Sequence, residues 1–154
     1  TTPSDREIAI SRTFDAPAAL VWDAHVDPVL LKRWMLGPPG WNMPVCDIDL
    51  RVGGRYRYEW RSDADGSQFG TGGEYREIVP GRRIVHTEQM DGMPGEALCT
   101  IELTEAGGRT TLTYTMRFGS TEARDAALQS GMSDGMAAGY DRLEGEILQG
   151  AARR

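Results

Sequence analysis

Hydrophobic and polar positions follow different periods in different parts of the chain. Near the N-terminus Ile8 and Ile10 alternate with their neighbours, as in a first strand, and Asp15-Ala16-Pro17 ends that strand. Two short segments with helical spacing follow, one after Pro17 and one opened by Asp27-Pro28, and proline suits the first turn of a helix. The pattern predicts one strand and then two short helices.

The period changes to two between about Met43 and Phe118. Glycine-containing turn signals divide this region into six predicted strands, at Gly53-Gly54, Asp65-Gly66, Pro80-Gly81, Gly92 to Gly95, and Gly107-Gly108. Together with the first strand they predict a seven-stranded antiparallel sheet. Such a meander buries one face against the long amphipathic element that remains.

That element is one long helix predicted from Ser120 onward. Its apolar stripe is Leu128, Met132, Met136, Tyr140, Leu143 and Ile147. A second stripe holds Gly131, Gly135 and Gly139, and each interior glycine costs a helix about 1 kcal/mol relative to alanine. Either a strand backbone packs closely against this stripe, or the space beside it is left open as a cavity.

Aromatic residues mark the face of the sheet that we expect to cover the helix. Tyr56, Tyr58 and Trp60 alternate with Arg55 and Arg57. The last strand places Leu112, Tyr114, Met116 and Phe118 on one side in the same way. Inward tyrosine and tryptophan need partners for their O–H and N–H groups, which a partly hydrated cavity supplies, although such stripes also occur in ordinary cores.

The strand after Pro80-Gly81 leaves two alternatives open. If Ile84 faces inward, so do His86 and Glu88, and an inward carboxylate then needs a partner. If Val85 and Thr87 face inward instead, His86 and Glu88 are solvated, because a shift of one residue exchanges the faces.

Length, charge and composition limit the function classes. The 154 residues and 40% apolar content predict a single domain, residues 1–154, and a net charge of −6 argues against nucleic acid as a partner. Lacking an apolar run of about 20 residues, the chain is expected to have no membrane span and to be cytoplasmic. Cys46 and Cys99 are predicted to be buried thiols, with no metal site and no cofactor.

Two apparent motifs carry little weight. Gly131-Met132-Ser133-Asp134-Gly135 matches a serine-nucleophile pattern, but it falls within the predicted helix and both histidines precede it. Asp63, Asp65, Ser67 and Glu74 have the spacing of a calcium loop with the glycine misplaced, so an Asp-Gly hairpin explains them better.

Several segments resemble a known family over nearly the whole chain. They are Ile10–Pro17, Val21–Ala24, Asp27-Pro28, Leu31–Trp34, Asp49–Tyr56, Gly73–Pro80, and Gly131-Met132 with Gly135. These segments are similar to the homologues of the activator of the Hsp90 ATPase, within the START-like (Bet v 1-like) superfamily also called SRPBCC.

The resemblance implies an α+β helix-grip fold, in which a curved antiparallel seven-stranded sheet wraps a long C-terminal helix, with two short helices after the first strand. It also implies a hydrophobic cavity between sheet and helix. The chain departs from the family pattern at His86 and Glu88, where aromatic residues are common, and at Met35 and Met136, where tryptophan is common. Methionine is smaller and more adaptable, which favours a larger or reshaped cavity.

Three functions are compatible with these patterns. The favoured one is binding of a small apolar or aromatic ligand in the cavity. The second is a chaperone-associated role, which the family name implies. The third is a cyclase or hydrolase that uses His86 and Glu88 as its acid–base pair, so that a polar pair facing the ligand would favour an enzyme and a wholly apolar cavity would favour carriage.

The predicted ligand-binding residues are Trp34, Met35, Trp41, Tyr56, Tyr58, Trp60, Tyr75, His86, Glu88, Met116, Met132, Gly135, Met136 and Tyr140. The loop between Trp34 and Trp41, which includes Met35 and Leu36, is expected to form the rim of the cavity. Its alternatives are a hydrophobic plug or a homodimer contact.

Overall fold

The computed structural model describes residues 2–36, 39–92 and 95–148. Its seven strands form one antiparallel sheet in the order β1-β7-β6-β5-β4-β3-β2. The strands are β1 (Glu7–Phe14), β2 (Trp41–Ile48), β3 (Arg55–Ser62), β4 (Gln68–Val79), β5 (Arg83–Met90), β6 (Ala97–Ala106) and β7 (Arg109–Arg117). The helices are α1 (Ala18–Val26), α2 (Pro28–Trp34), α3 (Thr121–Gln129) and α4 (Met132–Leu143), and a π-helical turn, Glu144–Leu148, follows α4.

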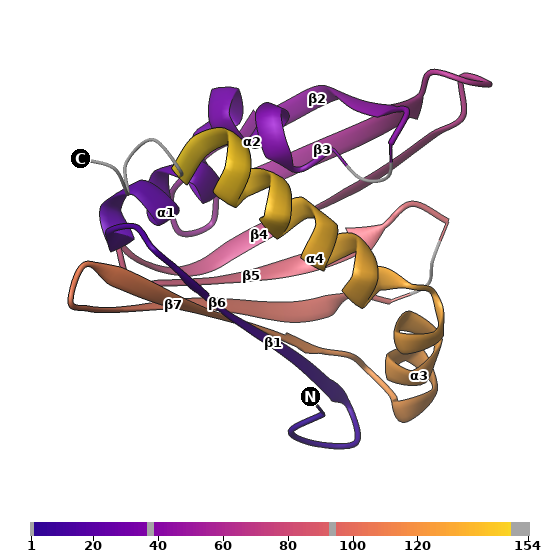
Figure 1. The fold of residues 1–154 in the computed structure, drawn as a ribbon. Helices are drawn as coiled ribbons and strands as arrows, with labels where there is room; N and C mark the ends of the chain where they lie inside the picture. The colour runs from indigo at the N-terminus through magenta and orange to yellow at the C-terminus, as the bar shows by residue number, and fades with distance from the viewer. Residues whose placement is uncertain (1, 37–38, 93–94, 149–154) are drawn as a thin grey trace.

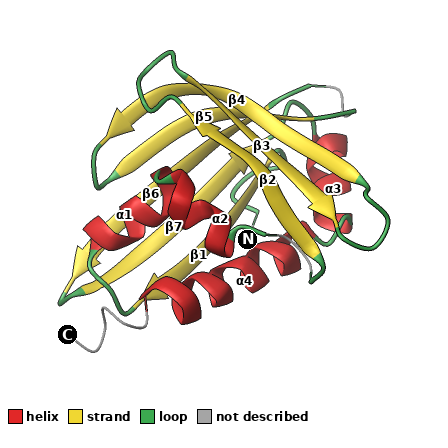
Figure 2. Ribbon diagram, turned by 90° about the horizontal axis from the view of Figure 1, so that it is seen from above, coloured by secondary structure: helices red, strands yellow, loops and turns green. Residues whose placement is uncertain are grey.

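The sheet curves strongly, and α1, α2 and α4 lie on its concave side (Figure 1). Figure 2, the same molecule seen from above, shows α4 running along that side beside the two short helices. This arrangement is the α+β helix-grip fold that the sequence predicts. No helix within the described residues is long and apolar enough to span a membrane.

Local sequence explains where the short helices and turns form. The Asp27 side chain accepts a hydrogen bond from the Val29 amide at 2.9 Å and caps α2, with Pro28 in its first turn. Ser120 caps α3 in the same way through the Ala123 amide at 3.1 Å. Gly66 in the β3–β4 hairpin has φ of +74°, which glycine adopts without a steric penalty.

The C-terminal segment is not one long helix as predicted, but two helices joined at Ser130 and Gly131. Gly131 has φ of +80°, a left-handed conformation that ends α3 and begins α4 in a new direction. Leu128, assigned to the apolar stripe, is therefore exposed on α3.

The glycine stripe consequently does not form a groove as predicted. Gly131 is the joint between the helices, and Gly135 is exposed, with no described atom within 4 Å of the position of an added Cβ. At Gly139 the nearest atoms of the Trp34 ring lie 3.8 Å from that position. That distance is an ordinary van der Waals contact, so an alanine side chain would fit beside Trp34 and close packing does not require glycine at position 139.

The C-terminal half of α4 is packed tightly at one end of the concave side. Tyr140 stacks on Trp34 with ring centroids 5.5 Å apart and meets the edge of Phe14 at 5.7 Å. Arg12 of β1 binds both Asp141 and Glu144 at 2.7 Å. This end of the molecule is sealed by aromatic packing and fixed by ion pairs.

The N-terminal half of α4 is packed more loosely. Met132, Met136 and Tyr140 are expected to contact the sheet face that carries Tyr56 and Tyr58, and all three pack on that concave face, the two methionines against the cluster of β1, β6 and β7 that contains Met116. Met136 also reaches the cluster that Tyr58 adjoins. Tyr56 itself packs in a separate cluster with Tyr75 and Ile84.

Candidate functional site

Strand β5, the middle strand of the sheet, places His86 and Glu88 on the concave face. Ile84 and His86 are 3% and 7% exposed, and Glu88 follows on the same side. The structure thus settles the facing of this strand in favour of the first alternative. Thr87, on the opposite side of the strand, is buried as well, and its hydroxyl accepts a hydrogen bond from the Glu74 amide.

His86 is held by a small hydrogen-bond network. The Tyr56 hydroxyl donates to the Thr87 carbonyl at 2.6 Å, so its oxygen is free to accept from His86 Nδ1 at 3.1 Å. Nδ1 also lies 3.2 Å from the Thr87 carbonyl. We therefore assign the hydrogen to Nδ1, which leaves Nε2 as an acceptor. Burial lowers the pKa of His86 and favours this neutral form.

Glu88 lies among groups that give it no countercharge. Its charge raises the pKa of Tyr56, Cys99 and Tyr114, which places the carboxylate close to all three. Burial raises the pKa of Glu88 itself. Among the described residues, none forms a hydrogen bond or an ion pair with its carboxylate.

The concave face contains space that protein side chains do not fill. Within residues 2–36, 39–92 and 95–148, only Nε2 of His25 is a buried side-chain polar atom with neither a partner nor accessible surface. The Glu88 carboxylate and His86 Nε2 have no partner either, so they retain accessible surface. Tyr58 and Tyr114 also remain partly accessible, although burial raises the pKa of both hydroxyls well above the usual range.

A series of aromatic rings connects this space with the surface of the molecule. Phe69, which is 37% exposed, stacks on Trp60 at a centroid distance of 5.0 Å and meets Trp41 at 5.5 Å. Trp60 continues to Tyr58 at 6.0 Å, and Tyr58 to Tyr56 at 4.9 Å. Sequence reasoning missed Phe69, which the register of the Asp65-Gly66 hairpin places opposite Trp60.

The predicted ligand-binding residues divide into two groups. Those with accessible surface on or beside the concave face are Met35, Trp41, Tyr58, Glu88, Met132 and Met136. Those buried in the packed clusters or the hydrogen-bond network are Trp34, Tyr56, Trp60, Tyr75, His86, Met116 and Tyr140, although His86 keeps an accessible Nε2. Gly135 lies on an exposed flank of α4.

Trp34 and Trp41 differ in particular. Trp34, expected at the rim, is 3% exposed and donates its indole N–H to the Ala24 carbonyl at 2.8 Å. Trp41 is half-buried beside Phe69, in a position that fits a rim. Residues 37 and 38 of the same loop lie outside the described residues.

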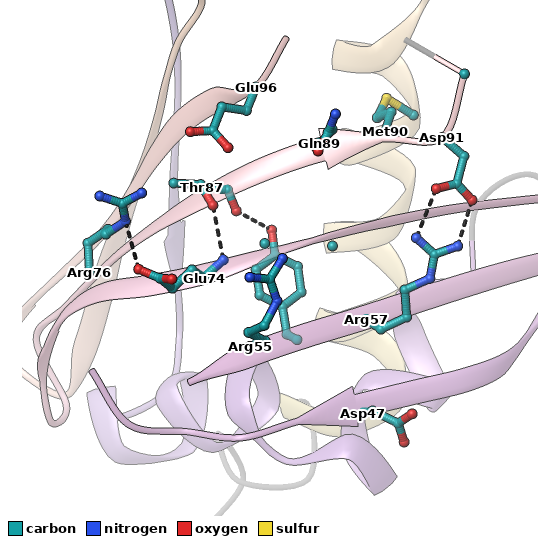
Figure 3. Close-up of a pocket in the computed structure, with 14 residues that line it drawn as sticks. Asp47, Arg55, Arg57, Glu74, Arg76, Thr87, Gln89, Met90, Asp91 and Glu96 are labelled. Atoms are coloured by element: carbon teal, nitrogen blue, oxygen red, sulfur yellow. Dashed lines mark hydrogen bonds and ion pairs between the residues drawn. The ribbon is translucent and has the colours of Figure 1, made fainter. Parts of the chain in front are cut away.

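The convex face of β3, β4 and β5 carries a hollow of about 650 Å³ with a charged lining (Figure 3). Arg57 crosses it and binds Asp91 through two hydrogen bonds of 2.9 and 2.6 Å. Hydrogen bonds from Arg57 lower the pKa of Asp91. Arg76 pairs with Glu74 at 3.2 Å.

Two glycines of β4 leave room for the side chains and backbone groups that line the two faces of the sheet. A Cβ at Gly70 would lie 2.4 Å from the Arg57 guanidinium. Arg57 can adopt its position only because Gly70 has no side chain. A Cβ at Gly73 would lie 1.9 Å from the Thr87 carbonyl oxygen that anchors Tyr56. Gly73 therefore supports the network on the concave side.

Comparison with known proteins identifies the family. The model of the activator of Hsp90 ATPase homolog 1-like protein family matches residues 15–147. The chain belongs to this family. Among curated proteins no match is found.

Solved structures of similar proteins support the family and the fold. A protein from Rhodobacter sphaeroides is 30% identical with a TM-score of 0.87, covering 94% of this chain and 93% of its own. One from Chromobacterium violaceum is 31% identical with a TM-score of 0.78, covering 94% and 98%. An AHSA1-like protein from Aeromonas hydrophila, 21% identical with a TM-score of 0.74 and covering 90% and 92%, shares the fold.

Proposed function

We propose that this member of the family binds a small, mainly apolar or aromatic molecule between the concave face of the sheet and α4. The observation that carries the proposal is the accessible surface left on Glu88, His86, Tyr58 and Tyr114 deep within the fold. A protein that needed only a core would gain stability by filling that space, because interiors are otherwise closely packed. The name of the family raises a chaperone partner, but no feature of the described surface favours one.

The lining supports a ligand with an apolar body. Tyr58 and Tyr114 offer ring surface from the sheet, and Met132 and Met136 offer flexible thioether side chains from α4. Ligand sites of this kind combine many apolar contacts with a few polar groups that set orientation. The aromatic series from Phe69 to Tyr58 provides an apolar approach from the surface.

Titration with a neutral fluorescent probe, N-phenyl-1-naphthylamine, tests the proposal. We expect saturable fluorescence enhancement with one probe per chain. Met136→Trp should weaken binding about tenfold or more by filling the space, since tryptophan is common here in similar sequences and should be tolerated. Leu128→Trp, on an exposed position of α3, is the matched control and should bind like the wild type.

Equal binding by the wild type and Met136→Trp would contradict the proposed location. Absence of saturable binding by the wild type would contradict the function itself. Native mass spectrometry of detergent-free protein provides the independent check, because a co-purified small molecule should be retained by the wild type and lost from Met136→Trp.

One observation favours acid–base catalysis as a second candidate function. His86 and Glu88 both face the same space, and burial moves their pKa values toward each other, down for the imidazole and up for the carboxyl. Such a pair is suited to proton transfer. Recovery of the co-purified molecule unchanged after incubation would support carriage. Its conversion by the wild type, abolished in His86→Asn, would support an enzyme.

A further inference from the structure

We infer that the ligand of the concave site carries a protonated amine that binds the carboxylate of Glu88. The inference rests on the proposed function and adds the polar chemistry of the ligand to it. Its basis is the juxtaposition of an unpaired carboxylate, a neutral imidazole acceptor and aromatic faces within one space.

The carboxylate has no protein partner that would satisfy it. Burial is the cause of the raised pKa of Glu88, and among the described residues no arginine or lysine acts on it. Arg12, a basic residue on the inner side of β1, is already bound to Asp141 and Glu144. A desolvated carboxylate is costly unless it is paired, so a cation supplied by a ligand satisfies a need that the protein leaves open.

The imidazole adds a second acceptor on the same side. Because His86 donates through Nδ1 toward the Thr87 carbonyl, the accessible Nε2 can only accept. His86 and Glu88 are two residues apart on one strand, so their Cα atoms are about 7 Å apart. A primary ammonium group has three donors and can bind the carboxylate while a donor elsewhere on the ligand reaches Nε2.

The surrounding rings also favour a cation. Tyr56 lies beside Tyr58 at a centroid distance of 4.9 Å, and Tyr114 lies 6.3 Å from His86. The faces of such rings attract ammonium groups. An anionic ligand would instead meet a carboxylate, an acceptor nitrogen and negative ring faces, so fatty acids and other apolar acids should be rejected.

Three ligands with the same body and different head groups test the inference: 2-(2-naphthyl)ethylamine, 2-(2-naphthyl)ethanol and 2-naphthylacetic acid. Calorimetric titration at neutral pH should show the amine binding about tenfold or more tightly than the acid, with the alcohol between them. In Glu88→Gln, which keeps the shape of the side chain, the amine should lose about tenfold and the alcohol should change by less than about threefold.

Glu96→Gln is the matched control, because it removes the same charge from the lining of the convex hollow. It should leave all three affinities unchanged. Equal affinities of the wild type for amine and acid, or an unchanged amine affinity in Glu88→Gln, would overturn the inference while leaving the proposed function intact. If none of the three binds and the neutral probe also fails, the proposed function falls instead.

Discussion

The two faces of strands β3, β4 and β5 use polar residues in opposite ways. On the convex face the hollow is lined with charges, but Arg57 binds Asp91 and Arg76 binds Glu74, so these groups satisfy one another. On the concave face there are fewer polar groups, and Glu88 has no partner among the described residues. A hollow is therefore less informative about a ligand than an accessible polar atom that has no partner within the protein.

The concave side itself contains a similar contrast. At the packed end His25 is sealed, with Nδ1 bound to the Val21 carbonyl at 2.7 Å and its ring against Trp34. In the middle of the sheet His86 keeps an accessible Nε2. Both histidines are neutral because of burial, but only His86 is placed to contact a small molecule.

The largest expected effect comes from Gly73→Ala, which should disturb the network of the concave face. The new Cβ would lie 1.9 Å from the Thr87 carbonyl oxygen, so the backbone must move, and we expect a loss of about 3 kcal/mol or more in the free energy of unfolding. Urea denaturation measures it. Gly119→Ala, at a glycine with open space around it, is the control, and equal stabilities of the two variants would refute this role of Gly73.

Acid should destabilise the packed end through His25. Burial lowers its pKa from 6.5 to about 4, so the unfolded chain binds a proton first as the pH falls. Stability should therefore decrease from about pH 6.5 to about pH 4, by roughly 3 kcal/mol in total, and not change further from this source below pH 4. Denaturation at several pH values should show a shallower dependence in His25→Phe, and an unchanged dependence would contradict the assignment.

Glu88→Gln should stabilise the unliganded protein at neutral pH, by up to about 1 kcal/mol, because it removes a desolvated charge without changing the shape. The sign follows from the raised pKa of Glu88, since its favourable neutral form is lost as the pH rises through that pKa. Thermal denaturation compares it with Glu96→Gln on the convex side. Destabilisation by Glu88→Gln alone would mean that the carboxylate has a structural partner.

Arg57→Ala should have the smallest effect, less than about 1 kcal/mol, because its ion pair with Asp91 is partly exposed. The difference from the wild type should shrink further in about 1 M salt, where exposed charges are screened. Affinity for the neutral naphthyl probe should remain unchanged. A loss of probe binding in this variant would show that the convex face is coupled to the concave one.

Most of the fold could be predicted from periodicity and turn residues. The alternation around Tyr56 and the glycine turns determined the strands, and Asp27-Pro28 located α2. The break at Gly131 could not be predicted, because helical spacing of apolar residues continues through it and only the backbone angle shows the left-handed turn. The regular spacing of apolar residues therefore does not show that the chain changes direction between α3 and α4.

The candidate site was less predictable. The facing of His86 and Glu88 depends on which side of the strand meets the buried residues of neighbouring strands, such as Cys99 opposite His86, and the alternation of a single strand does not specify this. Phe69 belongs to the aromatic series because it pairs with Trp60 across a hairpin, and this pairing becomes visible only when the register of the two strands is known. The lining of the convex hollow brings together Arg57 and Asp91, which are thirty-four positions apart in sequence.

Strand β5 lies between β4 and β6 in the middle of the sheet, and Glu88 pairs with Ala97 of β6. A side chain there can be exchanged while the backbone pairing of its strand remains. Under the proposed function, a change of this one side chain should alter the choice of ligand and leave the sheet intact. For protein engineering, position 88 is a tuning point at which amide, carboxyl and apolar side chains should yield receptors of different selectivity on one scaffold.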